Sequence, residues 1–158
     1  MSALADVVVD VTLQHLLSAA KLPEPARLAV IAYGRWGGKA LGYASDLDLI
    51  FLMPDDTAAH RDQLTRIAQR LQSWLTTLTA AGRAYDIDVR LRPDGVSGLL
   101  LSSVSAFAEY QREKAWTWEH QALTRARFAA GDAALGAAFE PIRENIIATQ
   151  LDETTRRN

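Results

Sequence analysis

The sequence predicts an α+β fold in which a small mixed β-sheet is backed by helices. Two short apolar runs, residues 28–34 and 46–53, have the length and composition of buried strands. Residues 84–92 alternate strictly between apolar and polar side chains, which is typical of a strand with two different faces. Helical periodicity dominates the two ends of the chain, so most of the predicted helical mass lies outside the strands.

The N-terminal part is predicted to hold a helix, a linker and the first strand. Residues 3–20 form the helix, because side chains recur there at spacings of three or four. These side chains are Leu4, Val8, Val11 and His15. The stretch "KLPEPAR" is a linker that Pro23 and Pro25 break. The strand "LAVIAYG" follows and ends at Gly34.

Residues 58–81 carry the clearest helical pattern of the chain. Their apolar side chains line one face at helical spacing. These side chains are Leu64, Ile67, Ala68, Leu71, Leu75 and Leu78. Pro54 stops the strand that precedes the helix, and Asp56 or Thr57 can cap its start. Gly82 lies where a C-terminal glycine is common.

The C-terminal half is predicted to be mainly helical. The turn "PDGVSG" and the short strand "LLLS" lead into a helix at residues 105–114. A second helix is expected over residues 116–130, closed by Gly131. Asp132 can cap a last helix, which Pro141 should interrupt because proline removes a backbone donor.

Composition narrows the classes of protein to which the chain can belong. Its 158 residues are 49% apolar and 23% charged, which is ordinary for one globular domain. A net charge of −2 gives no basic footprint for nucleic acid. The absence of cysteine excludes a disulfide scaffold and fits a reducing compartment. No signal peptide and no apolar run of membrane-spanning length occur, so we expect a cytoplasmic protein without a membrane partner.

Two pairs of aspartates lie on the predicted strands. Because side chains alternate along a strand, Asp46 and Asp48 project from the same side. The core face of that strand carries Leu47, Leu49 and Phe51. On the later strand the apolar face holds Tyr85, Ile87, Val89 and Leu91, and the polar face holds Asp86, Asp88, Arg90 and Arg92.

Three of these carboxylates, Asp46, Asp48 and Asp88, favour a magnesium site. Like charges this close repel unless a cation lies between them, and Mg²⁺ prefers hard oxygen ligands together with substrate phosphates. Such sites serve phosphoryl and nucleotidyl transfer. The alternative is a solvated strand end beside a half-exposed edge strand, with Arg90 and Arg92 as salt-bridge partners of Asp88. The two arginines could also contact a polyphosphate.

The loop between the first two strands favours phosphate binding. Its glycines are Gly34, Gly37, Gly38 and Gly42, and glycine lets backbone N–H groups approach a phosphate. Lys39 and the hydroxyl of Ser45 can donate to phosphate oxygens. The loop matches neither the Walker A nor the dinucleotide-binding pattern. A loop of tight turns without a ligand is the alternative.

Several aromatic and imidazole side chains can be explained by structural roles without a ligand. An exposed Trp36 could stack on a base or contact a partner, but packing over the sheet is equally compatible with the sequence. Trp116 and Trp118 cannot share one helix face, which argues against an aromatic cage. Core packing is the expected role of His120.

The motifs together resemble a known family. A glycine turn before Asp-x-Asp, with a third aspartate on a later strand, resembles the nucleotidyltransferase superfamily typified by DNA polymerase β. The stretch "YGRWGGKALGYASDLDLIFL" is similar to the glutamate–ammonia-ligase (glutamine synthetase) adenylyltransferase family, whose pattern is "GK-L-GG-EL-Y-SDLDL-F". Arg35 and Trp36 replace its usual Lys and Leu. "IDVRLRPDGVSGLL" and "AFAEYQREKAWTWEHQALTRAR" are also family-like, so the resemblance covers roughly residues 28–140.

This resemblance implies a polymerase β-like fold that transfers AMP from ATP to a tyrosine of glutamine synthetase, in the presence of Mg²⁺. It implies catalytic and metal-binding roles for Asp46, Asp48 and Asp88. Asp88 would act as base for the tyrosine hydroxyl or orient it. The residues expected at the nucleotide are Gly34, Gly37, Gly38, Lys39, Ser45 and Arg90. Glutamine synthetase is the implied partner, with the PII signal protein as a partner of the full-length enzyme.

The family joins two such domains, one attaching AMP and the other removing it by phosphorolysis. "GYASDLDL" and "AWTWEHQALTRAR" favour the C-terminal, adenylylating half. The alternatives are the deadenylylating domain, or a non-catalytic regulatory module, which would not need three carboxylates. We expect residues 1–27 to be an N-terminal helix and linker and residues 28–131 the catalytic core. Residues 132–158 would be a helical extension that continues into a further domain of a longer polypeptide.

Overall fold

The computed structural model describes residues 1–22, 26–56 and 58–157, and these are built around a five-stranded sheet. Its strands are β1 (Ala29–Ala32), β2 (Leu47–Met53), β3 (Ile87–Asp88), β4 (Leu101–Ser103) and β5 (Arg127–Gly131). The order across the sheet is β3-β2-β1-β5, and β4 also pairs with β2. The predicted α+β class with a small mixed sheet is confirmed.

The central pair of the sheet is antiparallel, whereas the edge strands beside β2 are parallel to it. β1 lies antiparallel to both β2 and β5. β3 pairs in parallel with the first two residues of β2, and β4 pairs in parallel with its last three. One edge of β2 is therefore shared by two short strands, and β3 brings Asp88 level with Asp48.

Helices cover the sheet and are joined by loops. They are α1 (Ser2–Ala19), α2 (Gly34–Gly37), α3 (Arg61–Thr76), α4 (Val104–Glu113), α5 (Thr117–Leu123) and α6 (Ala133–Arg157), with 3₁₀ turns at Ala58–His60 and Gly95–Ser97. No helix of the described residues is long and apolar enough to cross a membrane.

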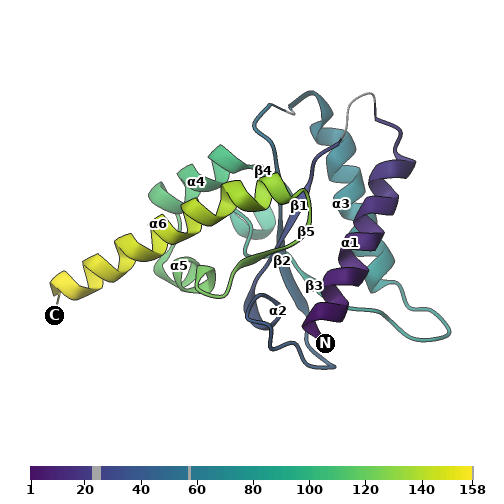
Figure 1. The fold of residues 1–158 in the computed structure, drawn as a ribbon, viewed down its shortest axis with the longest axis horizontal. Helices are drawn as coiled ribbons and strands as arrows, with labels where there is room; N and C mark the ends of the chain where they lie inside the picture. Colours follow the sequence, from purple (N-terminus) through teal and green to yellow (C-terminus); the bar gives the residue numbers. More distant parts are fainter. Residues whose placement is uncertain (23–25, 57, 158) are drawn as a thin grey trace.

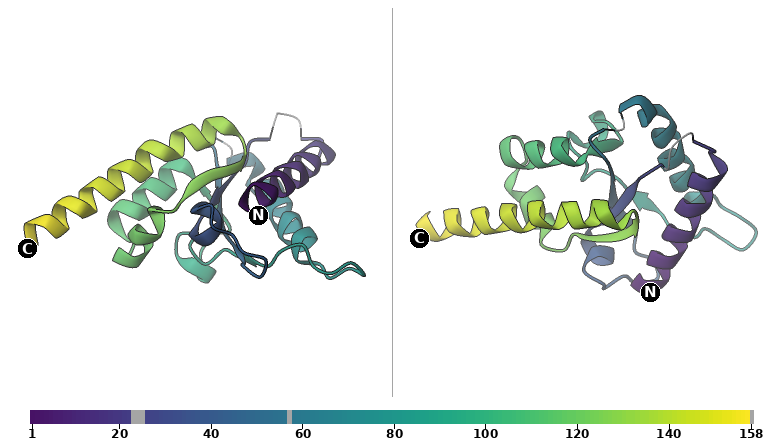
Figure 2. Two further views of the ribbon diagram at one scale, coloured as in Figure 1. Left: turned by 60° about the horizontal axis from the view of Figure 1, so that its bottom comes forward. Right: turned by 45° about the horizontal axis from the view of Figure 1, so that its top comes forward.

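The helices cover both faces of the sheet and give a three-layer arrangement (Figure 1). α1 and α3 pack on one face, and α4, α5 and α6 pack on the other. The second half of α6 extends away from the body of the molecule (Figure 2). Each face has its own hydrophobic core because alternate residues of the buried strands point to opposite sides.

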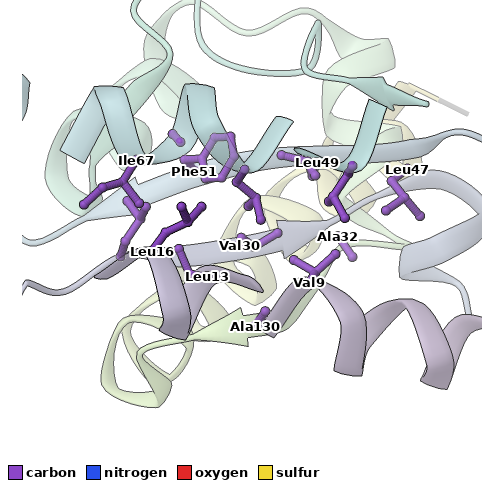
Figure 3. Packing of buried hydrophobic residues seen from close by; sticks show 14 of the residues in the cluster. Val9, Leu13, Leu16, Val30, Ala32, Leu47, Leu49, Phe51, Ile67 and Ala130 are labelled. Carbon is purple, nitrogen blue, oxygen red and sulfur yellow. The ribbon is translucent and has the colours of Figure 1, made fainter. Parts of the chain in front are cut away.

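The larger core lies between the sheet and the α1–α3 layer (Figure 3). Leu47, Leu49 and Phe51 belong to it, which confirms the predicted core face of β2. The N-terminal helix is confirmed, but its buried face differs from the one that the spacing suggested. Its buried residues are Ser2, Ala5, Val9, Leu13 and Leu16, whereas Leu4 and Val11 are exposed.

The predicted helix over residues 116–130 is wrong in its second half. α5 ends at Leu123, and residues Arg127–Gly131 form β5. This segment pairs with β1 along the edge that β2 leaves open. An unpaired edge there would leave backbone N–H and C=O groups of a fully buried strand without partners. Sheet pairing therefore overrides the helical preference of the sequence.

Pro141 lies inside α6 and does not interrupt it, contrary to the prediction. The helix carries buried side chains on both sides of this residue, Phe139 before it and Ile146 after it. Packing of these side chains in the core that α4, α5 and α6 share with the sheet compensates for the backbone hydrogen bond that proline cannot make. Asp132 does cap the start of the helix, because its carboxylate accepts from the backbone N–H of Ala134.

Other predicted elements are confirmed in kind but are shorter. The helix expected over 58–81 is α3, and it begins at Arg61 after a 3₁₀ turn, so Asp56 does not cap it. It stops before Leu78, which is 72% exposed, and Gly82 instead forms a tight turn with Thr79. The strand over 84–92 has ladder pairing only at β3. Pro23, Pro25 and Thr57 lie outside the described residues.

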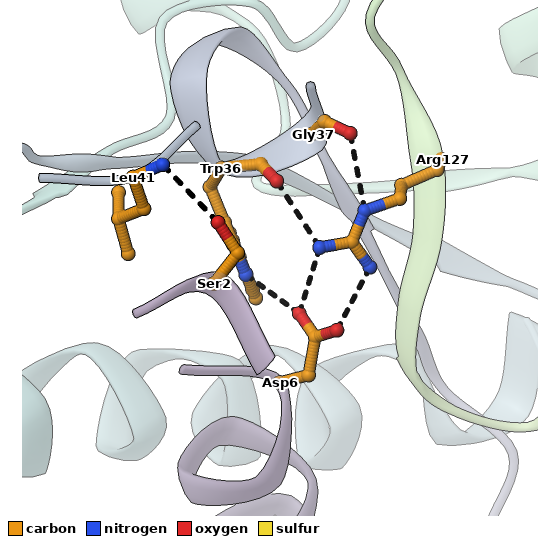
Figure 4. A network of polar contacts seen from close by, with 6 residues as sticks. All are labelled: Ser2, Asp6, Trp36, Gly37, Leu41 and Arg127. Atoms are coloured by element: carbon orange, nitrogen blue, oxygen red, sulfur yellow. Dashed lines mark hydrogen bonds and ion pairs between the residues drawn. The ribbon is translucent and has the colours of Figure 1, made fainter. Parts of the chain in front are cut away.

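A polar network ties α1 to the loop that follows β1 (Figure 4). The Asp6 carboxylate accepts a 2.7 Å hydrogen bond from the indole of buried Trp36 and two from the guanidinium of Arg127, at 2.9 and 3.0 Å. Arg127 also donates to the carbonyls of Trp36 and Gly37. The network thus joins α1, α2 and β5 at the start of the glycine-rich loop.

We predict that Asp6→Ala lowers the free energy of unfolding by about 2–3 kcal/mol, because it leaves a buried indole N–H and a largely buried guanidinium without their acceptor. Urea unfolding of Asp6→Ala, Arg127→Ala and the double variant measures the effect. The double variant should lose less than the sum of the two single losses. Strict additivity of the two losses would contradict the network, and Asp62→Asn, which removes an exposed carboxylate on α3, serves as the control.

Candidate functional site

The candidate site lies where β2 begins. Asp48 is half-buried on β2 and is the register partner of Asp88 on β3. Partners in a parallel pair project to the same side of the sheet, so the two carboxylates face the same space. Asp46 lies one residue before β2 and is exposed. The structure thus brings the three predicted aspartates to one end of the sheet.

The open space around these carboxylates follows from how β2 is covered. Asp48, Ile50 and Leu52 alternate onto the face toward α4, α5 and α6. Ile50 and Leu52 are buried in the core on that side, whereas Asp48 remains accessible. The helices therefore cover the later part of the strand and leave its beginning open to a ligand.

Asp48 lies close enough to Asp88 and Asp46 for their charges to affect its protonation. Partial burial raises the pKa of Asp48, and the charges of Asp88 and Asp46 raise it further. Hydrogen bonds from Arg90 lower the pKa of Asp88. The guanidinium Nε of Arg90 lies 2.8 Å from Oδ2 and 3.0 Å from Oδ1 of Asp88, and the backbone N–H of Arg90 donates to Oδ1 at 2.8 Å.

These side chains are suited to a divalent cation in chemistry, but they are not gathered into a closed metal cluster. Within residues 1–22, 26–56 and 58–157, no three carboxylate or imidazole groups are arranged to hold one ion. Asp88 faces Arg90, as the salt-bridge alternative anticipated. Partial burial and the charges of Asp88 and Asp46 disfavour the ionised form of Asp48, and hard oxygen donors beside a repelled carboxylate are what Mg²⁺ prefers.

Gly34 stands directly against Asp48. It begins α2 with a φ of +57°, in the left-handed region that glycine tolerates best. A Cβ atom on Gly34 would lie 2.2 Å from Oδ2 of Asp48. The backbone N–H of Tyr33 also donates to the carbonyl of Asp48 at 2.8 Å. The turn at Gly34 and the carboxylate of Asp48 therefore pack directly together, and only glycine leaves room for the carboxylate.

The rest of the predicted phosphate loop forms a helical turn that the sequence did not reveal. The N–H groups of Gly37 and Gly38 donate to the carbonyls of Tyr33 and Gly34, so these amides are engaged within the turn. Lys39 is exposed with a φ of +57°. Ser45 closes the following turn by accepting a hydrogen bond from Gly42 N–H. Their roles at a nucleotide stay predictions.

Two predicted alternatives are decided by side-chain contacts. Trp36 is fully buried and bonded to Asp6, so the packing alternative is confirmed and the exposed, base-stacking alternative is wrong. Arg92 donates to the carbonyls of Val89, Val96 and Gly98, and therefore braces the turn after β3 instead of pairing with Asp88.

Trp116 and Trp118 together line a pocket beside Arg90 that the sequence did not reveal. Helical periodicity placed these two residues on different faces, but Trp116 precedes α5 and has extended backbone angles, φ −78° and ψ 157°. The signal that could have revealed this is Glu119 three residues later, because that spacing is typical of a residue that precedes a helix.

We predict that Gly34→Ala destabilises the protein by about 1–3 kcal/mol more than Gly82→Ala, because only the former drives a methyl group into Asp48. Gly82 is the matched control, since it also has a positive φ, +103°, but nothing lies within 4 Å of the added Cβ. Denaturant unfolding measures both. Equal losses would show that backbone conformation alone demands glycine at position 34.

We predict that Asp48→Asn raises the thermal midpoint of the metal-free protein at pH 7 by on the order of 2 °C. Because folding raises the pKa of Asp48, the ionised carboxylate lowers the free energy of unfolding. This loss is absent below the unfolded-state pKa and is fully present once the pH has risen through the folded-state pKa. Thermal melts between pH 3 and pH 8 measure the difference. A stabilisation that persisted undiminished at pH 3 would contradict this electrostatic origin.

Comparison with known proteins gives one consistent result. A family model described as glutamate-ammonia ligase adenylyltransferase matches residues 1–142. Relatives named bifunctional glutamine synthetase adenylyltransferase/adenylyl-removing enzyme include those of Chromobacterium violaceum, 52% identical over 100% of this chain, and Neisseria meningitidis, 48% identical over 98%. The relative from Aromatoleum aromaticum is 52% identical over 96% of the chain. The chain spans only 18%, 17% and 16% of the lengths of these three proteins, respectively.

Proposed function

The chain belongs to the glutamate-ammonia ligase adenylyltransferase family, and on that premise we propose that it transfers AMP from ATP to a tyrosine of glutamine synthetase. The observation that carries the proposal is the unit formed by Gly34, Asp48 and Asp88: a turn that only glycine can make, set against two carboxylates on neighbouring strands. Regulation of nitrogen assimilation would follow from this modification of its target.

In the proposed reaction the tyrosine oxygen attacks the α-phosphorus of ATP. A new phosphorus–oxygen bond forms, the bond between the α- and β-phosphates breaks, and pyrophosphate leaves. Asp88 orients the tyrosine hydroxyl or accepts its proton. Gly34, Lys39 and Ser45 are proposed to face the phosphates, and Arg90 lies close enough to Asp46 and Asp48 to interact with the charge of both.

Asp46, Asp48 and Asp88 do not by themselves form a closed metal cluster, so Mg²⁺ would be held by these carboxylates together with the phosphates of ATP. It would screen the repulsion at Asp48 and stabilise negative charge on the transferring phosphate. The direction of the pKa shift at Asp48 supports this assignment, since a carboxylate repelled by its neighbours gains most from a cation. Arg90 would then be shared between Asp88 and the nucleotide.

The reverse activity is the nearest rival, because the relatives carry both an adenylyltransferase and an adenylyl-removing activity in their names. In that reaction orthophosphate attacks the tyrosyl-AMP phosphorus, the bond to tyrosine breaks, and ADP leaves. We propose the adenylylating direction because the sequences of residues 42–49 and 115–127 resemble the adenylylating half of the family. A cytoplasmic location and recognition of the PII signal protein by the full-length enzyme belong to the same proposal.

We predict that Asp46→Asn combined with Asp48→Asn lowers Mg²⁺-dependent AMP transfer at least about 100-fold, because charge stabilisation worth several kcal/mol is lost. Incorporation of label from α-³²P-ATP into unmodified glutamine synthetase measures transfer. A parallel reaction with adenylylated glutamine synthetase and orthophosphate measures release of ADP and identifies the direction.

Asp62→Asn on α3 is the control for removal of an exposed carboxylate. Circular dichroism should show that the double variant retains the fold. Full activity of a folded double variant would refute the assignment of the carboxylates. Binding of glutamine synthetase without any nucleotide transfer or binding would instead favour the non-catalytic module.

A further inference from the structure

The pocket beside Arg90 has a volume of about 290 Å³. It is bounded by Arg90, Tyr110, Lys114, Trp116, Trp118 and Glu119 among others. Arg90 connects it to the candidate site, because the same guanidinium holds Asp88 and interacts with the charges of Asp48 and Asp46. Anything that fills this pocket therefore lies next to the proposed site of chemistry.

The pocket exposes aromatic surface that the fold does not use. Trp116 is 71% exposed and Trp118 is 56% exposed, while Trp36 is fully buried. An indole face is a good stacking surface for a planar base, and such stacking tolerates water around it. The pocket is lined by two cations, Arg90 and Lys114, and by two carboxylates, exposed Asp94 and buried Glu119. The two exposed indoles beside the two cations match a ligand with one flat apolar end and one anionic end.

Hydrogen bonds to α4 hold the segment that carries Trp116 and Trp118. Glu119 is almost fully buried, and its two carboxylate oxygens accept from the hydroxyl of Tyr110 at 3.0 Å and from the backbone N–H of Trp116 at 2.8 Å. Nε2 of His120 lies 2.7 Å from the carbonyl of Gln111. These contacts fix α5 to α4 and hold the backbone of Trp116 in place before a ligand arrives. A pre-organised site binds at lower entropic cost.

We propose that this pocket binds the adenine base of ATP, stacked on Trp116 and Trp118, with Arg90 and Lys114 directed to the phosphates. The proposal rests on the proposed nucleotidyl transfer and adds the base-binding site that it requires. The pocket volume suits a purine nucleoside, whereas a folded acceptor protein would need a broader surface. A base held there places its attached phosphates toward Arg90 and the carboxylates.

Isothermal titration calorimetry of the chain with MgATP and with magnesium tripolyphosphate tests the base-binding site. Tripolyphosphate keeps the anionic end of the ligand and lacks the base. We expect Trp118→Ala and Trp116→Ala each to weaken MgATP binding about tenfold, within the range measured for base–aromatic stacking, and to leave tripolyphosphate binding unchanged. Trp118→Phe should restore most of the loss, because it keeps an aromatic face.

Trp74→Ala is the matched control, since Trp74 is similarly exposed, at 52%, but lies on α3 on the opposite face of the sheet. Unchanged MgATP affinity in both pocket variants would overturn the base-binding site while leaving the proposed function intact. A raised KM for glutamine synthetase with unchanged ATP affinity would overturn it in favour of acceptor docking. If the unaltered chain binds neither MgATP nor tripolyphosphate, the proposed function fails as well.

Discussion

The Asp6 carboxylate is the contact on which the geometry of the glycine turn depends. It accepts from the indole of Trp36 and the guanidinium of Arg127, and so connects a helix, a turn and a strand that are far apart in the sequence (Figure 4). Arg127 in turn holds the carbonyls of the turn. The N-terminal helix is therefore a part of the framework of the candidate site, because its Asp6 holds both Trp36 of the turn and Arg127, which bonds the carbonyls of the turn.

The candidate site holds a carboxylate, Asp48, whose negative charge is disfavoured by folding. β3 sets Asp88 level with Asp48, and partial burial raises the cost of charge at Asp48 further. Arg90 relieves this repulsion only in part, since its hydrogen bonds go to Asp88. Under the proposed function, a bound cation would supply the compensation that folding does not.

Much of the fold could be predicted from the local pattern of apolar and polar residues in the sequence. Strand β2, helix α3 and the alternation that puts Leu47 and Asp48 on opposite sides follow from periodicities of two and 3.6 residues. The failures share one cause. Residues Arg127–Gly131 have a helical pattern but form a strand, and α6 continues through Pro141, because pairing partners and packing surfaces from distant segments outweigh weak local preferences.

By itself, the sequence determined the fold class, the aspartates on neighbouring strands and the family, since these depend on residue identity and short-range spacing. The tertiary structure alone decided that Gly34 must fit against Asp48, that Trp36 is buried, and that Trp116 and Trp118 line one pocket. The physical reason is that burial and side-chain contact are set by which segments meet in space, and periodicity along one segment carries no information about its neighbours.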